Sequence, residues 1–194
     1  MSSETPFQII KLDLKNILLK PAKHVREVKL SDMKEFFGDV NEAEKMLSAG
    51  KDPVIYKYCE FEASDVFGDM VVGLTVIYPG KVGREYFMTR GHFHERDSGE
   101  IYYCLRGSGM LLMQSKDGKV VHAELTQGNL CHVAPGWGHR TINTGRGRFI
   151  FLFFYPAGSG HNYGIIKEKG FAKLVVAEKG KPQVIDNPKY VAQQ

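Results

Sequence analysis

The spacing of hydrophobic residues changes once along this chain, close to Pro53. Beyond that point apolar and polar residues alternate with a period of two in short runs such as VIYKYCEFE (54–62), MVVGLTVIY (70–78) and EIYYCL (100–105). Turn-forming stretches such as SKDGK (115–119) separate these runs. Alternation of this kind places every second side chain on one face of a strand. About nine such strands joined by glycine-rich turns predict an all-β barrel or jelly roll.

The first fifty residues predict a short helical N-terminal extension instead. LSDMKEFF (30–37) has the apolar face of a helix, and NEAEKMLSAG (41–50) runs from Asn41 as N-cap to Gly50 just past the helix end. Before them, FQIIKLDLK (7–15) alternates in part and predicts a strand, either at a sheet edge or exchanged with a second chain.

The pattern as a whole predicts one domain, residues 1–194. Strands in FAKLVV (171–176) and KPQVID (181–186) are expected to close the barrel. The expected divisions are an extension over 1–52, a β-barrel over 53–187 and a tail over 188–194.

Composition and charge narrow the class of protein. The chain has 194 residues, 43% of them hydrophobic and 25% charged, as in a globular protein. Its net charge of +4 is spread along the sequence, so we expect no nucleic-acid partner. The sequence has no signal-peptide pattern and no apolar run of bilayer length, so no membrane partner is expected. Cys59, Cys104 and Cys131 lie in apolar runs and predict buried thiols in a cytoplasmic protein.

Two histidines and a glutamate gather in TRGHFHERDSGEIYYCL (89–105). His92 and His94 are two residues apart, so on an extended strand they point to the same side. Glu100 begins the following strand, where it can face them across the turn. The three side chains fit either a metal site or a polar turn between two strands, and H-x-H alone does not decide.

A second segment, GNLCHVAPGWGHRTIN (128–143), favours the metal site. It holds His139 between Pro135 and Asn143, and the distance from Glu100 is long enough for an intervening hairpin. His139 can therefore return beside the first three side chains and complete a set of nitrogen and oxygen ligands. His132, in an apolar strand of the same segment, is expected to be a core histidine.

The patterns H-x-H-x5-E-x6-G and P-x3-H-x3-N resemble the two motifs of the cupins, small β-barrels with a His-His-Glu-His metal site. The gap between His94 and Glu100 is longer than in most cupins, and Tyr86 stands where they have a glycine. Longer stretches resemble one branch, the archaeal cupin-type phosphoglucose isomerases, across roughly residues 7 to 190. These stretches are YPGKVGREYFMTRGHFH (78–94), EIYYCLRGSGMLL (100–112), WGHRTINTG (137–145), FIFLFFYPAGSGHNYG (149–164) and KGFAKLVV (169–176).

The resemblance implies a cupin jelly-roll barrel that interconverts glucose 6-phosphate and fructose 6-phosphate in glycolysis and gluconeogenesis. It implies one divalent metal ion per subunit, Fe(II) first, with Mn(II), Ni(II) or Zn(II) able to substitute. The implied ligands are His92, His94, Glu100 and His139, which leave two positions of an octahedral ion for adjacent sugar oxygens. Glu100 is implied as the catalytic base, and Tyr102 on the same strand face can relay a proton. A direct hydride shift without a base is the alternative.

Matching positions imply a sugar-phosphate substrate, whose contacts are expected to be Tyr56, Thr75, Thr89, Gly91, Tyr155, His161 and Tyr163. The loop around PAGSGHNYG (156–164) suits a closing segment. Proteins of this branch pair, so a homodimer is expected.

Three other functions remain open on the sequence. A metal-free cupin that binds sugars as a regulatory module has the same barrel but catalyses no reaction. An iron-dependent dioxygenase uses the same ligands but needs oxygen and no phosphate pocket. An isomerase or epimerase that acts on mannose 6-phosphate uses the same site on a related sugar.

Overall fold

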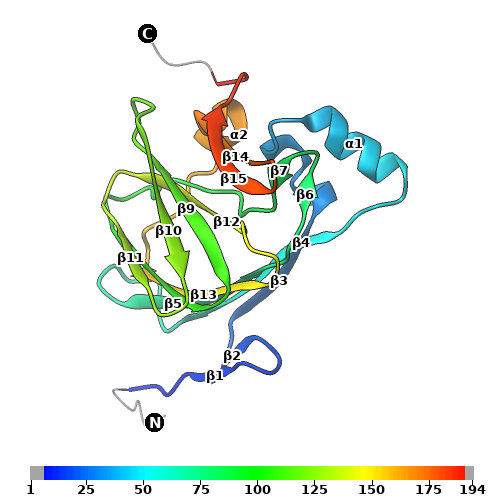
Figure 1. Cartoon of the computed structure of the whole chain (residues 1–194). Coiled ribbons are helices and arrows are strands. Elements are labelled where there is room, and N and C mark those ends of the chain that lie inside the picture. Colours follow the sequence, from blue (N-terminus) through cyan, green and yellow to red (C-terminus); the bar gives the residue numbers. More distant parts are fainter. Residues whose placement is uncertain (1–6, 191–194) are drawn as a thin grey trace.

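The alternating segments form two main antiparallel sheets that face each other (Figure 1). The computed structural model describes residues 7–190. The larger sheet has six strands, in the order β11 (Leu130–Val133), β8 (Glu100–Arg106), β13 (Phe149–Pro156), β5 (Met70–Ile77), β4 (Val54–Glu62) and β3 (His24–Lys29). The facing sheet has three strands, β10 (Val120–Thr126), β9 (Ser108–Gln114) and β12 (Gly138–Ile142). The predicted all-β architecture is confirmed.

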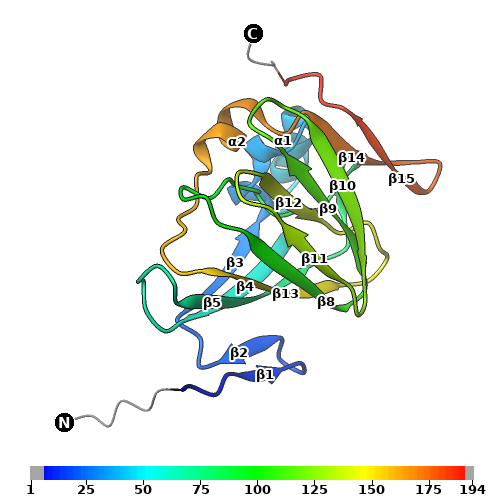
Figure 2. The ribbon, with the colours of Figure 1, turned by 90° about the vertical axis from the view of Figure 1, so that its left-hand side faces the viewer.

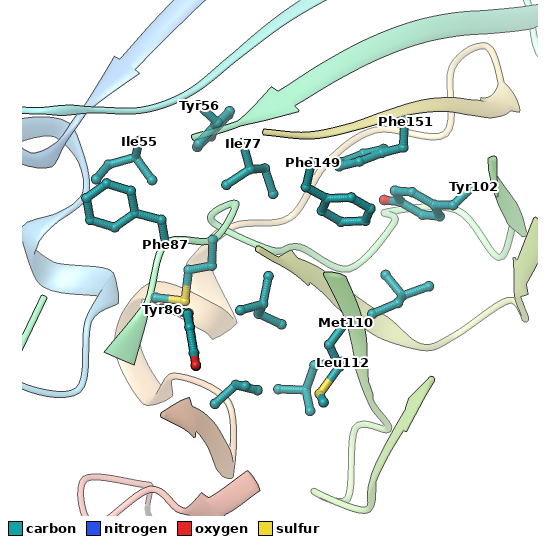
Figure 3. Packing of buried hydrophobic residues seen from close by; sticks show 14 of the residues in the cluster. Ile55, Tyr56, Ile77, Tyr86, Phe87, Tyr102, Met110, Leu112, Phe149 and Phe151 are labelled. Carbon is teal, nitrogen blue, oxygen red and sulfur yellow. The ribbon is translucent and has the colours of Figure 1, made fainter. Parts of the chain in front are cut away.

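The core lies between the two sheets. Figure 3 shows Phe149 and Phe151 of β13 and Tyr102 of β8 on one side, with Met110 and Leu112 of β9 opposite them. On β8 and β13 these residues alternate with residues that point to the other face of the sheet, whereas on β9 Leu111, between Met110 and Leu112, is buried as well.

Strand β13 carries a continuous apolar run because both of its faces are covered. Phe149 and Phe151 fill the barrel, whereas Ile150 and Leu152 point outward. There they pack under the N-terminal hairpin of β1 (Lys11–Asp13) and β2 (Leu18–Lys20), which lies outside the barrel in Figures 1 and 2. The strand predicted over 7–15 is therefore half of a local hairpin, and its partner β2 was not predicted.

A third sheet closes the end of the barrel opposite this hairpin. Its four strands are β15 (Lys181–Asp186), β14 (Lys173–Glu178), β7 (Glu85–Tyr86) and β6 (Lys81–Val82). The two closing strands predicted from 171–176 and 181–186 are confirmed. The loop after β13 is interrupted by a short helix, α2 (Gly164–Lys169), which the glycine-rich sequence did not predict. Of the predicted tail, 191–194 lies outside the described residues.

The N-terminal extension contains less helix than predicted. Two 3-10 helices, η1 (Leu30–Asp32) and η2 (Lys34–Phe36), replace the expected helix over 30–37. The second helix is α1 (Val40–Ser48), and its N-cap is Asp39 rather than Asn41, because the Asp39 carboxylate accepts the amide N–H of Glu42 at 2.9 Å.

Strand β3, for which no element was predicted, extends the large sheet beside β4. No helix among residues 7–190 is long and apolar enough to span a membrane.

Candidate metal centre and substrate pocket

Three chain segments bring the predicted ligands together. His92 and His139 lie directly opposite each other in an antiparallel bridge, where the two backbone N–H groups donate to the opposite carbonyls at 3.2 and 2.9 Å. His94 lies two residues further on, and Glu100 is the first residue of β8. The strand alternation that suggested the H-x-H motif thus places both side chains on the side that faces His139.

The four side chains form a compact buried cluster. Their potential ligand atoms all lie within 4.8 Å of one another. One carboxylate oxygen, Oε2 of Glu100, lies 3.0 Å from Nε2 of His139, 3.1 Å from that of His94 and 3.8 Å from that of His92. Glu100 and His139 are only 3% and 0% exposed, so few water molecules compete for these atoms.

The Nδ1 atoms of His94 and His139 point away from the cluster, and their hydrogen bonds indicate which tautomer each ring adopts. Nδ1 of His94 lies 3.1 Å from the carbonyl oxygen of Gly160, and Nδ1 of His139 lies 3.1 Å from that of Trp137. A carbonyl oxygen only accepts, so both Nδ1 atoms carry the proton. Both Nε2 lone pairs then face the Glu100 carboxylate, an arrangement that a cation among them stabilises. Nε2 of His92 is buried without a hydrogen-bond partner, and the donor set suits a divalent metal ion.

The electrostatics of the cluster favour an anionic Glu100 carboxylate and a neutral His92 imidazole. Burial alone would raise the pKa of Glu100, but the neighbouring imidazoles of His139, His94 and His92 hold it well below its usual range. Burial lowers the pKa of His92 well below the usual histidine value, and His139 and His161 lower it further. Metal ligation requires these same protonation states.

The cluster lies in a cleft that is open to solvent. Hydroxyl groups also line the cleft: Thr89 and Thr141 share a hydrogen bond of 3.1 Å, and Thr75 and Tyr56 line it from the six-stranded sheet. These four residues are called the hydroxyl wall. Gly91 contributes backbone there, with a φ of 75°. That angle strains any residue with a Cβ.

Aromatic side chains form the rim. The ring centroid of His161 lies 4.3 Å from that of His92, and His161 stacks on Tyr163. Burial lowers the pKa of His161 to about 4, so this ring is neutral at neutral pH. The Tyr155 hydroxyl donates to Oε1 of Glu60 at 3.3 Å, and burial raises the pKa of Glu60.

Most predicted site residues meet at this cleft. It is lined by Tyr56, Thr75, Thr89, Gly91, His92, Glu100, Tyr102, His139, His161 and Tyr163. His94 completes the metal cluster without lining the cleft, and Tyr155 lies behind the rim against His94 and His161.

Six further lining residues were not predicted: Tyr58, Glu60, Arg90, Thr141, Phe151 and Phe153. The period-two pattern could have found Tyr58 and Glu60, because they follow Tyr56 at steps of two on β4. The prediction of a core histidine at position 132 was wrong, since His132 lies exposed on the edge strand β11.

A double-sheet barrel with three histidines and one glutamate clustered beside a cleft defines the chain as a cupin-type barrel with a candidate metal centre. The sequence matches the family described as glucose-6-phosphate isomerase (GPI) over residues 27–193. The chain belongs to this glucose-6-phosphate isomerase family.

Relatives match it over nearly their whole length. The chain is 47% identical to the glucose-6-phosphate isomerase of Thermococcus litoralis over 98% of this chain and 99% of the relative. It is 43% identical to that of Pyrococcus furiosus over 93% and 95%. Among solved structures, oxalate decarboxylase from Bacillus subtilis is 18% identical, with a TM-score of 0.45 over 55% of this chain and 26% of that chain.

Proposed function

We propose that this protein interconverts glucose 6-phosphate and fructose 6-phosphate at a divalent metal ion held by His92, His94, Glu100 and His139. The observation that carries the proposal is the convergence of four ligand atoms within 4.8 Å beside a cleft lined with hydroxyl groups, in a chain of the glucose-6-phosphate isomerase family. An aldose–ketose isomerase must hold two adjacent sugar oxygens while hydrogen moves between C1 and C2.

The ligand residues would hold the ion, which supplies electrophilic polarisation of the sugar oxygens when bound. The chain prepares this arrangement before substrate arrives. Backbone carbonyls fix the Nδ1 tautomers of His94 and His139, so their Nε2 atoms stay available. The same hydrogen bonds fix the orientation of both rings.

Glu100 and Tyr102 are the proposed proton-handling groups. Glu100 is ionised, and Tyr102 is hydrogen-bonded to it with a pKa that burial and the Glu100 charge raise well above the usual tyrosine value. Tyr102 is therefore a neutral phenol, which can give up its proton to one sugar oxygen while accepting another from the neighbouring oxygen. Incorporation of solvent deuterium at C1 or C2 distinguishes proton abstraction by Glu100 from a direct hydride shift.

The hydroxyl wall is the proposed site of the phosphate. Thr75, Thr89, Tyr56 and Tyr163 offer hydroxyl donors, and Gly91 lets the backbone approach the ligand closely. Arg90 lies in the same lining and supplies a positive charge. At the rim, His161 and Tyr155 are the proposed contacts of the middle of the sugar chain.

We assign iron as the native metal, one ion per subunit, because mixed imidazole and carboxylate ligands suit Fe(II), although Mn(II), Ni(II) and Zn(II) also accept them. Three free cysteines fit a reducing cytoplasm. We take 1–194 as one cupin domain, with its barrel over 53–187. A homodimer would cover Ile9, Leu14 and Val25, which are 80%, 59% and 64% exposed along the N-terminal segment.

The test is an isomerase assay on fructose 6-phosphate before and after metal is removed with a chelator, followed by addition of Fe(II), Mn(II), Ni(II) or Zn(II) separately. Activity should be lost on removal and return on addition, and the four ions can be ranked. Elemental analysis of the protein as purified identifies a tightly held ion. Absence of activity with every ion would overturn the proposal.

A further inference from the structure

A second buried charge lies next to the metal cluster but faces away from it. Arg140 follows His139 on β12, and its residue is only 3% exposed. Its Nη2 donates to the carbonyl oxygen of Arg90 at 2.6 Å, and its guanidinium carbon lies 4.6 Å from the centre of the Phe171 ring. A guanidinium in such a place is costly to desolvate, so it has to make strong interactions.

The carbonyl that Arg140 binds belongs to the turn behind the hydroxyl wall. Before the turn, the backbone N–H of Thr89 donates to the carbonyl oxygen of Thr141 at 2.9 Å. After the turn, the backbone N–H of His92 donates to the carbonyl oxygen of His139 at 3.2 Å. Between these two bonds the chain turns through Arg90 and through Gly91, whose φ is positive. The guanidinium of Arg140 holds the carbonyl at the middle of this turn.

The turn also packs directly on the Arg140 side chain. A Cβ placed on Gly91 would lie 2.9 Å from Cβ of Arg140 and 2.7 Å from the Phe171 ring. The backbone of Gly91 and the hydroxyl of Thr89 therefore face the cleft, while the other side of the turn is supported by Arg140. A shift of Arg140 would change where both groups sit.

Glu85 supplies the opposing charge. It is 5% exposed, and its Oε2 accepts the backbone N–H of Gly38 at 2.7 Å. Burial raises the pKa of Glu85 to about 7, and the charge of Arg140 opposes that rise. Burial lowers the pKa of Arg140 to about 10, a change that Glu85 opposes, so Arg140 is protonated at neutral pH.

We propose that Arg140 is a positioning residue for the phosphate end of the substrate pocket: its bond to the Arg90 carbonyl fixes the turn that presents Thr89 and Gly91, with Glu85 as its counter-charge. This role rests on the proposed function, because the proposed function assigns Thr89 and Gly91 to the phosphate. It predicts an effect on binding of phosphate and little effect on the metal cluster, since His94 and His139 are oriented by their own carbonyl partners.

Four variants test the proposal: Arg140→Met, Arg140→Lys, Glu85→Gln and the double variant Arg140→Met/Glu85→Gln. Arg140→Met leaves Glu85 buried without its counter-charge and risks unfolding, whereas the double variant removes both charges together. Arg146→Met, at an exposed arginine of the turn before β13, is the matched control. For each variant one measures kcat and KM with fructose 6-phosphate, the affinity for inorganic phosphate by calorimetry, the metal content and the thermal unfolding temperature.

Arg140→Met and the double variant both lose the hydrogen bond to the Arg90 carbonyl, so KM should rise and phosphate binding should weaken by about 10-fold. In both variants kcat should change by less than about 3-fold, and the metal content should stay the same. Arg140→Lys, which keeps a charged donor, should recover most of the affinity. Glu85→Gln retains Arg140 and should leave KM near that of the wild type.

Unchanged KM and phosphate affinity in the folded double variant would overturn the proposal. A fall in kcat together with loss of metal would overturn it too, because Arg140 would then support His139 rather than the turn. A rise in KM with Glu85→Gln equal to that of Arg140→Met would assign the effect to the charge pair and not to the bond with Arg90. A wild type without isomerase activity would instead refute the proposed function, and the calorimetry would still test Arg140.

Discussion

Glu100 and Glu85 are both almost completely buried carboxylates, yet their environments shift their pKa values in opposite directions. Glu100 lies within 3.0 to 3.8 Å of three imidazoles, and they hold its pKa well below the usual range. Glu85 accepts one backbone N–H at 2.7 Å and interacts with the charge of Arg140, and burial raises its pKa to about 7.

The difference shows that burial alone does not make a carboxylate functional. Converging ligand atoms on His94, His139 and Glu100 form a site that can hold a cation and opens onto a cleft. At Glu85 and Arg140 both charges belong to the protein, and they support the backbone. The first arrangement is a place for a ligand, and the second is part of the framework.

The largest expected effect follows from removing a ligand. His139→Ala should lose most bound metal and lower kcat/KM by on the order of 1,000-fold, because the reacting oxygens lose their electrophile. The barrel should stay folded, as circular dichroism can show. His132→Ala, at the exposed histidine of β11, is the control and should keep full activity. Full activity in His139→Ala would remove His139 from the site.

Metal-dependent stability separates the two carboxylates directly. At a metal concentration 1,000 times the dissociation constant, binding should stabilise the wild type by about 4 kcal/mol. Glu100→Gln should abolish this metal-dependent rise in unfolding temperature, whereas Glu85→Gln should retain it. Thermal scans with chelator and with added metal measure both. Equal metal dependence in the two variants would mean that Glu100 is not a ligand.

The parts of this arrangement that were predictable from sequence are those set by short-range geometry. A step of two on a strand fixes the relative direction of His92 and His94, and the turn after them places Glu100 opposite. A continuous apolar run such as 149–156 is typical of a strand covered on both faces, but it does not reveal that the N-terminal hairpin covers the outer face. That cover comes from residues more than a hundred positions away.

Other features were missed because they depend on pairing across long distances. Thr141 reaches the cleft through the pairing of β12 with β9, which no local pattern reports. His132 was placed in the core because its strand is apolar, but β11 is an edge strand and one of its faces is open. Glu85 on β7 and Arg140 on β12 influence each other across a long sequence separation, and each residue alone has the sequence context of an ordinary surface charge.

A smaller effect is expected at the hydroxyl wall. Thr89→Val removes the hydroxyl that shares a hydrogen bond with Thr141, and it should raise KM for fructose 6-phosphate by about 5- to 10-fold with a smaller change in kcat. Steady-state kinetics measures this, and Thr126→Val on the exposed side of β10 is the control. An unchanged KM would show that Thr89 does not contact the phosphate.

The smallest effect concerns Glu60, a partly buried carboxylate that lacks the imidazoles around Glu100. Burial raises the pKa of Glu60, although the hydrogen bond from Tyr155 opposes the rise. The folded protein therefore holds this proton more tightly than the unfolded chain. Its contribution to stability is present at low pH and is lost as the pH rises above about 4.5, the usual glutamate value.

Glu60→Gln stays uncharged at every pH and can still accept the Tyr155 hydrogen bond, so it should avoid that loss. The unfolding temperature of the variant relative to the wild type should be higher at pH 8 than at pH 4.5, by a few degrees at most. Glu124→Gln, at an exposed carboxylate of β10, corrects for the general effect of removing a charge. If the difference between Glu60→Gln and wild type is the same at both pH values, Glu60 titrates alike in the folded and unfolded states. Its burial would then be balanced by its partners, as burial is at Glu100.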